Sequence, residues 1–89
     1  SDSTFKAVTG VLRELDLSEP LANLLWHLGP DAPPPTMSDV AGMMYCDPST
    51  VTFLVGRLEA RGLVVRRASE RDRRAKVVVL TEHGAAARG

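Results

Sequence analysis

The sequence predicts a mostly α-helical domain of the α+β class, in which helices precede a two-stranded β-hairpin. Apolar residues recur at helical spacing in four segments before residue 62, and two valine-rich stretches flank a polar segment after it. The chain has 89 residues, a length that suits one small core, so we expect residues 1–89 to form a single domain.

The composition excludes several classes of protein. Apolar residues make up 44% of the chain and charged residues 25%, as in folded soluble domains. No apolar run reaches the ~20 residues of a membrane helix, and no secretory signal pattern is present. Cys46 is the single cysteine, so no internal disulfide can form. These features predict a soluble protein of the cytoplasm that has no membrane partner.

Two helices are expected before residue 30. Apolar residues at three- and four-residue spacing predict the first over Phe5–Leu15. The second should start at Ser18, whose hydroxyl can cap it, with Pro20 in its first turn, and it should stop at Gly29. Its apolar stripe consists of Leu21, Leu24, Leu25 and Leu28. The proline-rich segment Asp31–Pro35 that follows must be a loop.

A short third helix is expected after this loop. Thr36 and Asp39 stand three residues apart, as in a capping box, where each side chain accepts a hydrogen bond from the other residue's backbone N–H. The inward-facing residues of this helix are Met37, Val40, Ala41 and Met44. Tyr45 and Cys46 then form a tight turn.

A fourth helix is expected over residues 48–61. Asp47 caps it, Pro48 occupies its first position, and Gly62 ends it in the left-handed conformation. At about 100° per residue, apolar and other residues separate onto opposite sides of this helix. The core side carries Val51, Leu54, Val55 and Leu58, and the outward side carries Ser49, Thr52, Phe53 and Gly56.

Two strands complete the predicted fold. Leu63–Ala68 and Lys76–Leu80 are rich in valine, and the segment Ser69–Ala75 between them is polar and basic, as the tip of a β-hairpin should be. Thr81 and Glu82 predict the beginning of one more helix.

The charges are separated along the sequence. The formal net charge is zero, but eight basic and three acidic residues between Arg57 and Lys76 give that segment +5, and the remainder carries −5. A polyanion responds to the field of one face of a protein and not to its net charge. The segment 57–76 is therefore a candidate surface for nucleic acid.

The order of these elements predicts a winged helix-turn-helix with a two-stranded β-wing, because two helices joined by a tight turn precede a basic hairpin. Small hydroxyl side chains near the start of the second of these helices can approach base edges in the major groove. Arginines at the hairpin tip can enter the minor groove, where the negative potential is concentrated. The pattern predicts a protein that binds double-stranded DNA.

Three stretches resemble the MarR family of bacterial transcription regulators: residues 48–64, the tripeptide Asp72-Arg73-Arg74, and residues 79–84. The resemblance implies a sequence-specific regulator of transcription whose Ser49, Thr50 and Thr52 contact DNA in the major groove. It also implies that Arg74 enters the minor groove, with Asp72 bracing the wing. The other candidate DNA-binding residues are Phe53, Arg57, Arg71, Arg73 and Lys76.

Three residues depart from the family's pattern. Phe53 stands where a basic or polar residue is common, so that a polar contact is lost or replaced by an apolar one. Gly56 stands where an acidic residue usually braces the wing. Tyr45 stands where glycine is typical of the turn, although a non-glycine residue at positive φ is uncommon.

Members of this family dimerise through helices at both ends of the chain, and they bind small molecules between the dimerisation and DNA-binding parts. The resemblance therefore implies a homodimer and a small-molecule effector for the intact protein. We expect this chain to lack most of the dimerisation helices. We also expect it to bind DNA weakly as a monomer, since two half-sites normally share the work of binding.

Neither an enzyme nor a cofactor is expected. No Ser-His-Asp set, glycine-rich phosphate loop or pair of buried carboxylates can be assembled. Cys46, His27 and His83 lack the spacing of metal ligands, and Trp26 is interpreted as a core or interface aromatic. The alternative to DNA binding is a winged helix that binds another protein, with Phe53 as an apolar anchor.

Overall fold

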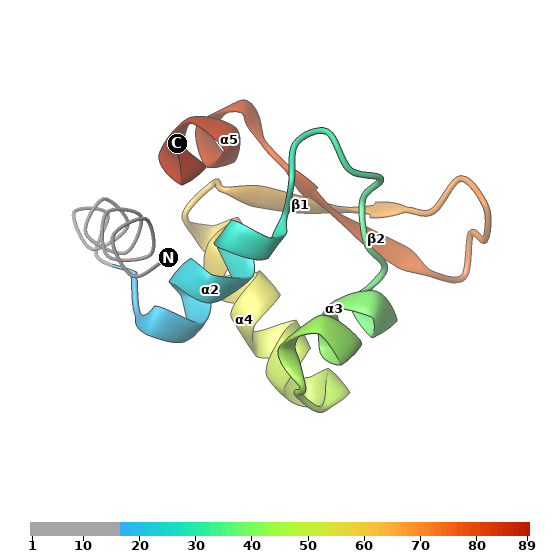
Figure 1. Ribbon diagram of the computed structural model, residues 1–89. Helices are drawn as coiled ribbons and strands as arrows, with labels where there is room; N and C mark the ends of the chain where they lie inside the picture. Colours follow the sequence, from blue (N-terminus) through green and yellow to red (C-terminus); the bar gives the residue numbers. More distant parts are fainter. Residues whose placement is uncertain (1–16) are drawn as a thin grey trace.

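The computed structural model describes residues 17–89, and the helix expected over Phe5–Leu15 lies outside them. The described residues form helices α2 (Glu19–His27), α3 (Met37–Met44) and α4 (Pro48–Ala60), strands β1 (Val64–Ala68) and β2 (Lys76–Leu80), and helix α5 (Glu82–Arg88). The hairpin of β1 and β2 extends outward beyond the helices (Figure 1). The predicted winged helix-turn-helix fold is confirmed.

The core forms where the apolar stripes of the helices meet the base of the hairpin. The predicted stripes of α2 and α4 are buried in full. In α3, Val40 is buried completely, whereas Met37, Ala41 and Met44 lie partly exposed against the core. Val64 of β1 and Val78 of β2 close the core on the side of the hairpin.

The starts of α2 and α3 differ in how their backbone N–H groups are satisfied. Ser18 stands at the N-cap of α2, but its side chain makes no capping hydrogen bond, so the expectation of a hydroxyl cap was wrong. A cap bonds the N–H of the second or third helical residue, and the second residue here is Pro20, which has none. At α3 the capping box is complete, with Thr36 and Asp39 bonded reciprocally at 3.0 Å in each direction.

The turn between α3 and α4 adopts the left-handed conformation at Tyr45, with φ of 53°. The N–H of Cys46 donates to the carbonyl of Ala41 over 3.1 Å and closes the end of α3. This conformation is costly for a residue with a Cβ atom. The Tyr45 side chain is 97% exposed, so no packing contact of the ring offsets this cost.

Strands β1 and β2 pair antiparallel, with Val64 opposite Leu80 and Ala68 opposite Lys76. The segment before α3 adds an interaction that the sequence pattern did not indicate. Thr36 forms an isolated bridge with Val77, and the N–H of Val78 donates to the carbonyl of Pro35 over 2.8 Å. A proline can accept such a bond although it cannot donate one, so the end of the proline-rich loop still ties α3 to the hairpin.

Helix α5 is fastened to the base of the hairpin through Thr81. Its Oγ1 donates to the carbonyl of Gly62 over 2.6 Å and accepts from the N–H of Gly84 over 2.9 Å. Its backbone N–H donates to the carbonyl of Leu63 over 3.1 Å. The end of α4, the end of β2 and the start of α5 therefore meet at one threonine.

The other end of α5 contacts α2. The Arg88 guanidinium donates from Nε and Nη2 to the carbonyl of Trp26, and its Cζ lies 4.8 Å from the centre of the Trp26 ring. Trp26 is 40% exposed, so it lies at the surface between these helices and not in the core.

Helix α4 begins at Asp47, whose carboxylate accepts a hydrogen bond from the N–H of Thr50 over 2.8 Å, as expected. The same oxygen accepts from the hydroxyl of Ser49 over 2.8 Å. These bonds favour the ionised form, and they lower the pKa of Asp47 below its ordinary value of 3.8. The cap of α4 is therefore charged across the neutral and mildly acidic range.

We expect Gly84→Ala to destabilise the fold by about 1–3 kcal/mol, because a Cβ at this buried position overlaps the carbonyl oxygen of Leu63 and forces α5 away from the hairpin. Urea unfolding measures the change. The matched control is Gly42→Ala in α3, where an added Cβ meets nothing. It should stabilise the protein by up to about 1 kcal/mol. Equal stability of the two variants would contradict the close approach at Gly84.

We expect Asp47→Ala to lower the free energy of unfolding at neutral pH. The difference in this free energy between the variant and wild type should become smaller in acid. A carboxyl whose pKa is lower in the folded state contributes stability above its unfolded pKa, and this contribution disappears as the pH falls through the folded value. Urea unfolding from about pH 7 to about pH 2 tests this. Asp47→Asn keeps a cap that carries no charge, so the difference in unfolding free energy between Asp47→Asn and Asp47→Ala should not change with pH. If the difference in unfolding free energy between wild type and Asp47→Ala did not change with pH, the charged cap would be excluded.

Candidate nucleic-acid interface

The outward side of α4 carries the candidate base-reading residues, because the opposite side is buried in the core. Ser49, Thr50, Thr52, Phe53 and Arg57 are all exposed. The first three lie in the first two turns of the helix, where small side chains leave the helix close to any surface that it meets. This part of the predicted site therefore forms one continuous helix surface.

Two of these hydroxyl groups are already used as donors. Ser49 Oγ donates to Asp47 Oδ1 over 2.8 Å, and Thr52 Oγ1 donates to the carbonyl of Pro48 over 2.9 Å. A hydroxyl has one proton to donate and two lone pairs to accept with. While these bonds are intact, Ser49 and Thr52 can meet a ligand only as acceptors or through their carbon atoms. Sequence reasoning did not show this restriction.

Phe53 and Arg57 form a pair one helical turn apart. The Arg57 Cζ lies 5.8 Å from the centre of the Phe53 ring, within the range of a cation–π contact. The Phe53 side chain is nonetheless 62% exposed. The pair places an apolar ring and a cation side by side on the outward side of α4.

The tip of the wing, residues 69–75, is shaped by hydrogen bonds within itself. Ser69 Oγ accepts from the N–H groups of Arg71 and Asp72 over 3.2 and 3.4 Å. Asp72 Oδ1 accepts from the N–H of Arg74 over 3.0 Å, and the N–H of Ser69 donates to the carbonyl of Ala75 over 3.0 Å. Asp72 therefore acts on the backbone of its own loop, which is a local form of bracing.

The basic side chains of the wing are exposed. Within residues 17–89, these side chains make no hydrogen bond or ion pair: Arg71, Arg73, Arg74 and Lys76. By contrast, Arg66 Nη2 lies 2.9 Å from Glu59 Oε1, which ties β1 to α4. The carboxylate that supports the wing thus comes from Glu59, one turn after Gly56, and sequence reasoning missed it.

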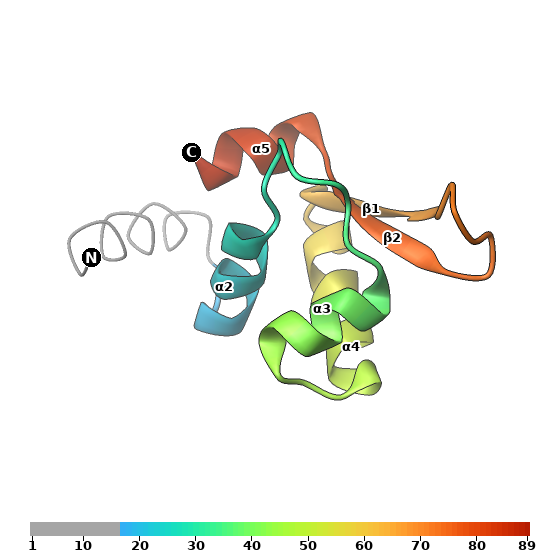
Figure 2. The same cartoon turned by 45° about the vertical axis from the view of Figure 1, so that its right-hand side comes forward.

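The wing tip and the beginning of α4 lie on the same side of the molecule, away from α5. Figure 2 shows α3 and the start of α4 at the bottom, the tip of the hairpin projecting to the right above them, and α5 at the upper left. Figure 1 shows the same relation from another angle. The tip of the wing and the exposed side of α4 are thus candidates for one shared binding surface.

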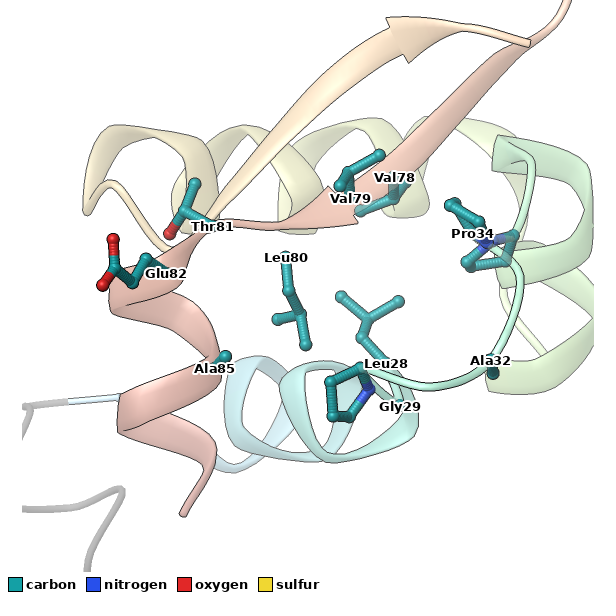
Figure 3. Close-up of a pocket in the computed structure, with 12 residues that line it drawn as sticks. Leu28, Gly29, Ala32, Pro34, Val78, Val79, Leu80, Thr81, Glu82 and Ala85 are labelled. Atoms are coloured by element: carbon teal, nitrogen blue, oxygen red, sulfur yellow. The ribbon is translucent and has the colours of Figure 1, made fainter. Parts of the chain in front are cut away.

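A separate hollow of about 230 Å³ lies between α5, β2 and the loop after α2, with the side chains of Leu28 and Leu80 near its centre (Figure 3). It is lined by Leu28, Gly29, Pro30, Ala32, Pro34, Pro35, Val78, Val79, Leu80, Thr81, Glu82 and Ala85. Glu82 is the one titratable residue among these described lining residues.

Residues 17–89 hold neither a metal-binding cluster nor a membrane-spanning helix. No cluster of three or more histidine, cysteine, aspartate or glutamate side chains is placed to hold a metal ion. No helix in that part of the chain is both long and apolar enough to cross a membrane.

Comparison with known proteins places this arrangement in a family. The family model for the MarR family matches residues 17–76. The organic hydroperoxide resistance transcriptional regulator of Bacillus subtilis is 38% identical over 50 residues, which are 56% of this chain and 34% of that protein. The chain therefore spans about a third of the length of this curated relative.

Solved structures share the fold. CouR from Rhodococcus jostii RHA1, bound to p-coumaroyl-CoA, is 36% identical with a TM-score of 0.78, over 93% of this chain and 58% of that chain. The S. aureus MepR–DNA complex superposes with a TM-score of 0.79 over 97% of this chain and 70% of that one, and its 24% identity shows the fold alone. With the family match covering α2 through the start of β2, this chain belongs to the MarR family.

Proposed function

We propose that this chain binds double-stranded DNA in a sequence-specific manner and forms the DNA-binding part of a transcriptional regulator. In this proposal α4 enters the major groove, and the wing over residues 69–76 enters the adjacent minor groove. The observation that carries it is the set of exposed, unpaired basic side chains on the wing, beside the exposed side of α4. Membership of a family whose relatives are named as transcriptional regulators supports it.

Binding strength comes mainly from phosphate contacts in this proposal. Arg57, Arg71, Arg73 and Lys76 are exposed at the edges of the two elements, where the DNA backbone passes. Each phosphate that a cation neutralises releases condensed counterions, so affinity falls as salt rises. Phosphate contacts fix the position of the protein on the duplex, but they do not read its sequence.

Sequence is read by the outward side of α4 and by the wing tip. Ser49, Thr50 and Thr52 face base edges in the major groove. With their protons held within the helix, Ser49 and Thr52 accept hydrogen bonds from the exocyclic amino groups of cytosine or adenine. Arg74 enters the minor groove, and Asp72 keeps its loop in shape through the bond to the Arg74 N–H.

The intact regulator works in the cytoplasm as a homodimer, in our proposal, and residues 1–89 form one domain of it without enzymatic activity or a cofactor. A two-fold dimer places two recognition helices about one turn of DNA apart. The bound p-coumaroyl-CoA in CouR supports a small-molecule effector for this protein as well.

We expect Arg74→Ala to weaken DNA binding and to lower the slope of log affinity against log salt concentration by about one, because a guanidinium in the minor groove also displaces a condensed counterion. Fluorescence anisotropy with a labelled duplex of about 25 base pairs, titrated at several salt concentrations, measures both. An unchanged affinity and slope would remove Arg74 from the interface.

The control for loss of charge is Arg88→Gln, which removes one positive charge from α5, on the other side of the molecule, together with the bonds of Arg88 to Trp26. It should leave the salt dependence of wild type intact, with circular dichroism confirming the fold. Failure of the wild-type chain to bind duplex DNA even at low salt would contradict the proposed function and favour the protein-binding alternative.

A further inference from the structure

Phe53 is a large apolar side chain in the middle of a polar surface. It lies one turn after Ser49 and one turn before Arg57 on the outward side of α4, and it is 62% exposed. Its ring can neither donate nor accept a conventional hydrogen bond. Any base that lies against Phe53 is therefore recognised by apolar contact.

The major groove offers one apolar group that distinguishes the bases, the C5-methyl group of thymine. An aromatic ring that covers this methyl removes apolar surface from water on both sides of the contact. The same ring placed against the amino group of cytosine would remove the water that accepts a hydrogen bond from this group, and the ring offers no acceptor in its place. An aromatic ring in the major groove therefore favours thymine over cytosine at the base that it covers.

The neighbouring residues agree with this form of recognition. Thr52 and Ser49 donate their hydroxyl protons within the start of the helix, so neither is free to donate to the O4 atom of thymine. Arg57 Cζ lies 5.8 Å from the centre of the Phe53 ring, and a cation–π contact at this distance favours the ring conformations that keep it. A ring that is already positioned loses less conformational freedom on binding.

We propose that Phe53 is a specificity-determining residue, which selects thymine by contact with its C5-methyl group, and that Arg57 positions its ring. This inference rests on the proposed function, because it concerns the surface of α4 that enters the major groove. It assigns to one residue a preference for one base.

The test removes the methyl group without changing base pairing. The wild-type chain first selects duplexes from a random pool about 25 base pairs long, at low salt, and we expect a recurrent thymine in the selected sequences. Each such thymine is then replaced by deoxyuridine, which differs only in lacking the C5-methyl group. We expect wild type to bind the deoxyuridine duplex about fourfold more weakly, as for one lost methyl contact.

The variant Phe53→Ala should bind the two duplexes equally and select pools without that thymine. Phe53→Leu keeps an apolar side chain and should retain part of the discrimination. Because Phe53 is largely exposed, both variants should fold, which circular dichroism checks. Arg57→Lys keeps the charge, but its ammonium holds the ring less well, so its discrimination should fall below that of wild type.

The matched control is Tyr45→Asn, which removes the other strongly exposed aromatic near the start of α4 and places a residue that tolerates positive φ there. It should discriminate thymine from deoxyuridine as wild type does. Equal binding of both duplexes by wild type, or discrimination that persists in Phe53→Ala, would overturn the role of Phe53 while leaving DNA binding intact. Recovery of no duplex at all would overturn the proposed function itself.

Discussion

The packing of one side of α4 against the core sets the orientation of every exposed residue on this helix. Val51, Leu54, Val55 and Leu58 lie in the core, so the helix cannot rotate without exposing them to water. This fixes which residues face outward. The positions of the exposed hydroxyls, the Phe53 ring and Arg57 therefore follow from the packing of residues that never meet a ligand.

The wing is held by hydrogen bonds, because most of its tip is too exposed to be stabilised by burial. Its shape comes from backbone N–H groups bonded to Ser69 and Asp72 and from the ladder between β1 and β2. The bases of both strands are fixed to the core by Val64 and Val78, and Glu59 adds an ion pair between α4 and Arg66. The arginines thus project from a loop that is ordered by local bonds, and their own side chains take no part in them.

Much of the fold could be predicted from the sequence, because periodic burial and capping chemistry act over a few residues. Asp47, Pro48 and Gly62 mark the ends of α4 by local conformational preferences, and the structure agrees with them. Interactions between distant segments left no comparable signal. The bridge from Thr36 to Val77, the Glu59–Arg66 pair and the contact of Arg88 with Trp26 all depend on tertiary placement.

In the candidate site, too, some features could be predicted from the sequence and others could not. Exposure of its residues could be predicted from the helical period, whereas the direction of individual protons could not. Thr52 could have offered its proton to a base, yet it bonds the carbonyl of Pro48, and Ser49 bonds Asp47. Such bonds depend on side-chain torsions that a residue's identity leaves open. The ion pair between Glu59 and Arg66, which takes the place of an acidic residue at position 56, likewise could not be predicted, because it depends on how α4 and β1 pack together.

The meeting of three elements at Thr81 has a mechanical consequence. One hydroxyl and one amide of this residue bond Gly62 after α4, Leu63 before β1 and Gly84 in α5, so these three elements are linked at one point. A displacement of α5 would therefore strain hydrogen bonds to the end of α4 and to the base of the hairpin at the same time.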